Sequence, residues 1–128
     1  MLPPRLFPFL APTAGMMLMA FCAGCGQTSE PPAPIPISEA PTGVRSAFAG
    51  APSALRQEAE AAADGIAGGD YVGSLGRLQM LSSSPDLSPE QLQALAQSRT
   101  AVITKLNEAA AAGDARAAAA METYRGSR

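Results

Sequence analysis

The chain has 128 residues with a formal net charge of −2, a length that is usual for a single domain. It contains no histidine and only two cysteines, which removes the commonest ligands of structural zinc and excludes a disulfide-rich fold. The nine basic residues form no basic stripe, so we expect no nucleic-acid ligand.

The N-terminal part of the chain is an apolar stretch. Residues 6–21 carry no charge, follow Arg5, and give way to a polar, proline-rich sequence after Cys25. This profile is typical of a secretory signal with its processing site. The small residues Ala23 and Gly24 before Cys25 resemble the lipobox of bacterial lipoproteins. The match is imperfect at Cys22, which stands where that family usually has an aliphatic residue, but cysteine is small and apolar enough for a hydrophobic subsite.

The resemblance implies that residues 1–24 are a signal peptide and that Cys25 is the lipidation site. In that family the thiol and the new α-amine of the cysteine carry the acyl chains, palmitate among them. The mature protein would then be anchored to a membrane of the cell envelope and face the periplasm. An Asp after the cysteine favours the inner membrane in that family, so Gly26 indicates the outer membrane.

Three other interpretations of this region compete with the lipid anchor. A retained transmembrane helix needs about 20 apolar residues, whereas this run is shorter and contains Pro8 and Pro12. Ordinary cleavage near Ala23 would leave a soluble periplasmic helical protein. A disulfide between Cys22 and Cys25 does not survive either cleavage, because the two residues are separated or one is discarded.

The next segment, residues 25–42, is predicted to be a lipid-anchored, disordered linker. Its part from Gly26 to Thr42 holds five prolines and only two large apolar side chains, those of Ile35 and Ile37. Such a composition cannot bury enough surface to order itself, and it favours extended polyproline II structure.

Residues 43–128 are predicted to be a small all-α domain, with three to four short helices arranged as two αα-hairpins. The ends of the helices are marked by Gly-Asp pairs and by a capping box that joins Ser88 to Gln91. The expected helices cover residues 53–67, 71–81, 89–112 and 115–124, with a short turn over 44–50 that points Phe48 inward.

The expected core is thin. By count, 27 of the 60 hydrophobic residues are alanine, which favours helix but buries little area. A core of this kind supplies only a few kcal/mol, so we expect marginal stability or support from a partner. The large side chains expected inside are those of Leu75, Leu78, Leu95, Val102, Ile103 and Leu106.

The Gly-Asp pair occurs twice, at Gly69-Asp70 and again forty-four positions later at Gly113-Asp114. Two stacked hairpins resemble, loosely, the scaffolds built from tetratricopeptide-like units. The spacing differs from the 34-residue period of that repeat. The other explanation is convergence, in which each glycine ends one helix and each aspartate caps the next without a shared repeat ancestor.

Candidate chemistry is sparse, and we predict no catalytic residues, no cofactor, no metal and no small-molecule substrate. Ser98 and Lys105 lie two helical turns apart, but a Ser–Lys pair needs a deprotonated lysine and Lys105 adjoins a solvated edge. The acidic residues Glu58, Glu60 and Asp64 supply no paired carboxylates for acid–base work.

Two functions from different classes remain. The first is a lipid-anchored binding or scaffolding module that presents a helical surface to another envelope protein. Apolar side chains near element ends would supply that surface: Tyr71, Met80, Met121 and Tyr124. The second is a structural spacer, which needs apolar heptads sustained over three or four repeats. The predicted helices are mostly too short for such heptads, so the sequence favours the module, with no catalytic activity.

Overall fold

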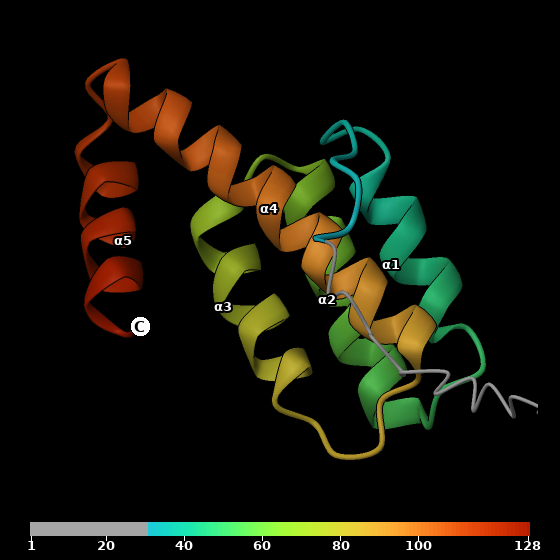
Figure 1. Cartoon of the computed structure of the whole chain (residues 1–128). Helices are drawn as coiled ribbons and strands as arrows, with labels where there is room; N and C mark the ends of the chain where they lie inside the picture. Colours follow the sequence, from blue (N-terminus) through green and yellow to red (C-terminus); the bar gives the residue numbers. More distant parts are fainter. Residues whose placement is uncertain (1–30) are drawn as a thin grey trace, which may run out of the picture.

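The computed structural model describes residues 31–128, and within that range it contains five helices and no strand (Figure 1). The predicted all-α class is therefore confirmed. The helices are α1 Ala40–Phe48, α2 Ser53–Ala67, α3 Tyr71–Ser82, α4 Pro89–Ala111 and α5 Ala115–Gly126. The signal peptide, Cys25 and the first residues of the expected linker lie outside the described residues.

The first four helices form a ring in which each packs against two neighbours. Helix α1 contacts α2 and α4, and α3 contacts the same two helices from the other side. Helix α5 folds back from the end of α4 and touches α3 only slightly. The two predicted hairpins are present as α2–α3 and α4–α5. The 23 residues of α4 agree with the expected range 89–112 to within one residue, although this helix is longer than the short helices of the predicted fold class.

The core lies inside this ring. Its largest fully buried side chains come from α1, α3 and α4: Phe48, Leu78, Leu95, Leu106, Val44 and Val102. Leu75 is also buried, as predicted, whereas Ile103 is only partly buried and packs against the edge of the core. Leu92 continues the predicted apolar stripe of α4 in the sequence, yet its side chain is 49% exposed.

The two Gly-Asp pairs form the same local structure. At the end of α2, the Asp70 N–H donates to the Gly65 carbonyl at 2.8 Å, and the Gly69 N–H donates to the Ile66 carbonyl at 3.1 Å. This pair of bonds is a Schellman motif, which places its glycine in the left-handed region; the φ angle of Gly69 is +81°. Asp70 then accepts a hydrogen bond from the Gly73 N–H and so caps α3.

The end of α4 repeats this arrangement around Gly113, whose φ is +98°. The Asp114 N–H donates to the Ala109 carbonyl at 3.0 Å, and the Asp114 carboxylate caps α5. Both corners predicted from the sequence are confirmed, as is the capping box. There, Ser88 and Gln91 exchange hydrogen bonds of 3.1 and 2.9 Å.

The linker prediction was wrong for residues 31–42. Helix α1 begins at Ala40, so the expected boundary at residue 43 falls inside a helix. Ala40 is fully buried, as is Val44 in the following turn of α1, and their contacts with the rest of the core hold this segment on the domain. The structure therefore has one helix more than the three to four predicted.

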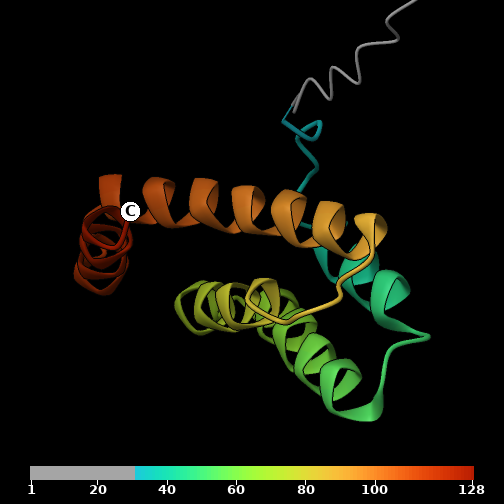
Figure 2. The ribbon, with the colours of Figure 1, turned by 60° about the horizontal axis from the view of Figure 1, so that its bottom comes forward.

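Residues 31–37, which we call the strap, have no regular secondary structure but are packed on the domain. Ile35 and Ile37 are partly buried against the core, and the amide Nε2 of Gln97 donates to the Ala33 carbonyl at 3.2 Å. In Figure 2 the strap lies on the outer side of α4, while α2 and α3 form the layer on its inner side.

Candidate functional site

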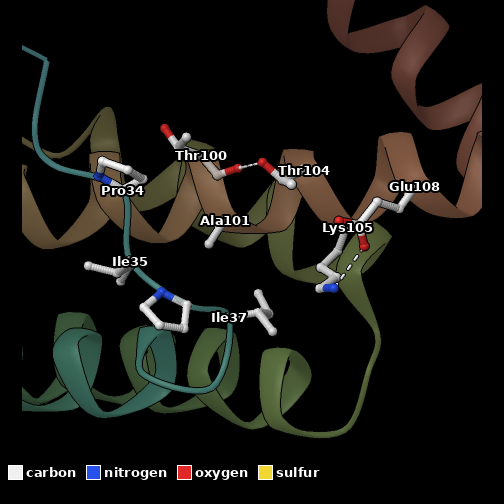
Figure 3. Close-up of a pocket in the computed structure, with 9 residues that line it drawn as sticks. Pro34, Ile35, Ile37, Thr100, Ala101, Thr104, Lys105 and Glu108 are labelled. Atoms are coloured by element: carbon white, nitrogen blue, oxygen red, sulfur yellow. Dashed lines mark hydrogen bonds and ion pairs between the residues drawn. The ribbon is translucent and has the colours of Figure 1, made fainter.

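The strap and α4 enclose a hollow of about 340 Å³, which Figure 3 shows in close-up. The strap supplies one wall with alternating prolines and isoleucines from Pro34 to Ile37. Helix α4 supplies the other wall with Thr100, Ala101, Thr104, Lys105 and Glu108. The lining holds one cation and one anion.

These two charges neutralise each other. The Lys105 ammonium donates to the Glu108 carboxylate at 2.7 Å along the rim of the hollow (Figure 3). This hydrogen bond is the main reason that the pKa of Lys105 lies above the ordinary lysine value of 10.5. Lys105 is therefore protonated at neutral pH and cannot act as a base there.

The Ser98 hydroxyl is engaged by the backbone of α1 and not by Lys105. The Ser98 side chain is completely buried, and its hydroxyl lies 3.5 Å from the Ala40 carbonyl, to which it donates. Two helical turns separate it from Lys105, a rise of about 10 Å along the axis. The structure does not bring the two residues together as a nucleophile and its base.

The acidic residues of α2 are used in ion pairs between helices. Arg45 of α1 donates to the Glu60 carboxylate at 2.9 Å and also bonds Asp64. These hydrogen bonds raise the pKa of Arg45 above the ordinary arginine value, and the bond to Glu60 has the larger effect. Arg77 of α3 pairs with Glu58 at 3.0 Å. These ion pairs could not be predicted from the sequence, because the two residues of each pair are 15 to 19 positions apart and lie on different helices.

A second hollow, of about 200 Å³, lies between α2 and α3. Leu55, Glu58, Met80, Leu81 and Ser84 line it. The Met80 side chain is 61% exposed, so this residue of the predicted apolar surface does face solvent. Helix α3 ends just beyond Met80 at Ser82, and the hollow opens at that end of the helix pair.

The other apolar residues proposed for the surface behave differently. Met121 is buried at 3% exposure, because it anchors α5 to the core, and that prediction was wrong. Tyr71 and Tyr124 are partly buried at the edge of the core. The guanidinium carbon of Arg128 lies 5.3 Å from the centre of the Tyr124 ring, within cation–π range.

Residues 31–128 contain no group of three or more potential metal-ligating side chains. None of the helices in that range has the length and hydropathy that a membrane span requires. Cys25, the predicted lipidation site, is outside this range, so its environment is not described.

Comparison with known proteins adds no relative: no family model, no curated protein and no solved structure matches this chain.

Proposed function

We propose that this chain is a lipid-anchored protein of the bacterial cell envelope whose helical domain binds or scaffolds another envelope protein. The anchor rests on the lipobox-like sequence that ends at Cys25. The lipid would hold the domain on the periplasmic side, with the outer membrane favoured by Gly26. The domain would work through its surface, without catalytic activity.

The hollow between α2 and α3 is the best candidate for the protein-binding surface. It combines an exposed methionine with two leucines, and methionine adapts its shape to a partner because its side chain is flexible and polarisable. The charged rim formed by Glu58 and Arg77 at 3.0 Å would fix the orientation of a bound segment. A short apolar side chain of a partner fits a hollow of about 200 Å³.

The proposed lack of catalysis is supported by how the reactive groups are used. Lys105 is held protonated by Glu108, and the Ser98 hydroxyl is buried against a backbone carbonyl. Three carboxylates of α2 are paired with arginines. No described residue stands out as a general base or an activated nucleophile.

A structural spacer is the alternative. The longest helix of the described part, α4, has 23 residues and spans about 35 Å, and its buried side faces other helices of the same domain. A spacer of coiled-coil type needs a seam left open for another chain. The packing therefore favours the binding module over the spacer. A soluble periplasmic form of the same module would follow if Cys25 were not acylated.

Photo-crosslinking in intact cells tests the binding surface. A crosslinking amino acid placed at Met80 should trap one protein, identified by mass spectrometry. The same probe at Thr123, on the exposed side of α5, serves as the matched control. If both positions trap the same mixture of proteins, or none, the binding module is refuted and the spacer remains.

A further inference from the structure

We infer that the outer face of α4, together with the strap, lies against the lipid bilayer that holds Cys25. This surface, the strap face, comprises the strap and six residues of α4: Gln93, Ala96, Thr100, Thr104, Asn107 and Ala111. The inference rests on the proposed lipid anchor and adds which side of the domain meets the membrane.

The strap leaves the domain on the outer side of α4 (Figure 2). Pro32 adjoins Leu92, Gln93 and Ala96 on the outer side of α4, where together they line a hollow of about 420 Å³. Seven residue steps separate Pro32 from Cys25, so the chain between them spans at most about 25 Å even when fully extended. The lipid on Cys25 therefore cannot move farther than that from the strap face.

The order of the helix layers determines which side of the domain this short tether brings to the bilayer. The strap and the outer side of α4 lie on one side of the domain, and α2 and α3 lie on the other side of α4 (Figure 2). A packed layer of helices adds about 10 Å of depth. With so short a tether, turning the α2–α3 layer toward the bilayer would require the chain to pass around the domain, whereas the strap face needs no such detour.

Charged side chains are distributed unevenly over the domain. Six α4 residues of the strap face follow helical spacing, lie opposite the buried stripe, and carry no charge: Gln93, Ala96, Thr100, Thr104, Asn107 and Ala111. The two charged residues of α4 that border the strap, Lys105 and Glu108, are paired with each other at 2.7 Å, so their charges cancel. The opposite layer is rich in charge at its surface: Arg56, Glu58, Glu60, Asp64 and Arg77. Bringing ionised side chains to a bilayer is costly, whereas neutral and small side chains are tolerated in its interfacial zone.

Leu92 borders the strap face and adds an apolar contact at its edge. It is one of the two large hydrophobic side chains exposed in the described part of the chain, and it stands beside Pro32. The other one, Met80, belongs to the hollow between α2 and α3. The two exposed apolar residues would thus serve different partners: Leu92 the lipid and Met80 the protein.

The chemistry of the strap face also identifies the kind of lipid surface. Since the six outer residues of α4 include no Lys or Arg, and Lys105 beside the strap is paired with Glu108, attraction to anionic headgroups contributes little. The contact would depend on the anchor and on apolar and hydrogen-bonding groups, and it would persist at high salt.

The chain contains no tryptophan, so a single introduced tryptophan reports its own surroundings. The full chain would be produced in a bacterial host as the Leu92→Trp variant and, as the matched control, the Met80→Trp variant. Both proteins would be reconstituted into phosphatidylcholine vesicles with and without phospholipids brominated near the headgroup. Intact mass would be measured first to establish the lipid on Cys25, and circular dichroism would verify that both variants remain helical.

For acylated protein, we expect a shift to shorter emission wavelength and quenching by bromine for Leu92→Trp, unchanged in high salt, and neither effect for Met80→Trp. Equal quenching of both variants, or none, would overturn the strap-face contact and leave the lipid anchor standing. An unmodified, vesicle-free protein would instead overturn the proposed anchor, and with it this inference.

Discussion

A methyl group at Gly65 should destabilise the domain through a single neighbour. Gly65 lies near the end of α2, where α3 crosses closely, and a Cβ atom there would fall well inside contact distance of Ser74 Oγ. Ser74 is buried, with 1% exposure, and its hydroxyl donates to the Asp70 carbonyl at 2.6 Å. The hydroxyl cannot turn away without losing this bond.

The magnitude follows from two opposed effects. Overpacking of this kind costs about 1–3 kcal/mol, while replacing glycine by alanine in a helix gains up to about 1 kcal/mol. We expect Gly65→Ala to lower the free energy of unfolding by about 1–2 kcal/mol, with a drop in melting temperature of about 4–8 °C per kcal/mol for a domain of this size.

Removing the Ser74 hydroxyl should reverse the sign of the change that Gly65→Ala causes in the free energy of unfolding. Ser74 Cβ would lie 3.7 Å from the new methyl group, an ordinary contact, and the Asp70 carbonyl keeps its bond from the Ser74 N–H at 3.0 Å. In a Ser74→Ala background, Gly65→Ala should therefore be neutral or stabilising by up to about 1 kcal/mol. Denaturant titrations of the four variants measure this coupling.

Gly76→Ala is the matched control, because Gly76 is an exposed helical glycine whose added Cβ meets nothing within 4 Å. It should stabilise the domain by about 1 kcal/mol. If Gly65→Ala stabilises the domain as much as Gly76→Ala does, or if Ser74→Ala fails to rescue it, the close approach of α2 and α3 is refuted.

Three further outcomes are expected. Leu95→Ala, which empties a core position at 1% exposure, should cost about 2–4 kcal/mol, whereas Leu92→Ala should cost less than about 1 kcal/mol; similar losses in denaturant titrations would contradict the assigned faces of α4. Asp114→Ala removes two hydrogen bonds that cap α5 and should cost about 1 kcal/mol, with loss of helicity by circular dichroism; unchanged helicity would argue against the cap. Because the pKa of Lys105 is raised in the fold, its pair with Glu108 stabilises the domain below the ordinary lysine pKa of 10.5, and this contribution is lost as the pH rises through the folded-state pKa. The difference in melting temperature between the wild type and Lys105→Gln should therefore shrink above that pH. A difference that grows would contradict a stabilising ion pair between Lys105 and Glu108.

The sequence predicted those parts of the fold that depend on local chemistry. The corners at Gly69-Asp70 and Gly113-Asp114 follow from a left-handed glycine and a capping carboxylate, and the start of α4 follows from Ser88 and Gln91. Each of these signals acts within six residues, so the sequence pattern contains it completely.

Helix α1 and the strap could not be predicted in this way. Ala40 has little to bury by itself and is fully covered only because α1 packs between α2 and α4. The partly buried Ile35 and Ile37 likewise depend on α4, more than sixty positions away in the sequence. The prolines around them suggested disorder, but the same prolines limit the conformations that the strap loses on packing.

The same distinction between local signals and contacts of distant residues applies to the candidate sites. The sequence predicted a solvated edge for Lys105, whose partner Glu108 lies one turn along α4, but the contact of Ser98 with Ala40 joins residues 58 positions apart and could not be predicted. The ion pairs of Arg45 and the hollow beside Met80 arise from contacts between helices and have no signal in the sequence. The lipidation of Cys25 stays a prediction from the sequence.

Intact mass spectrometry of the protein purified from bacterial membranes tests the central proposal most directly. We expect a mature chain that begins at Cys25 and carries acyl chains, and a Cys25→Ser variant that accumulates as unprocessed, lipid-free precursor. An unmodified mature N-terminus at or near Gly24, with the protein in the soluble periplasmic fraction, would contradict the lipid anchor.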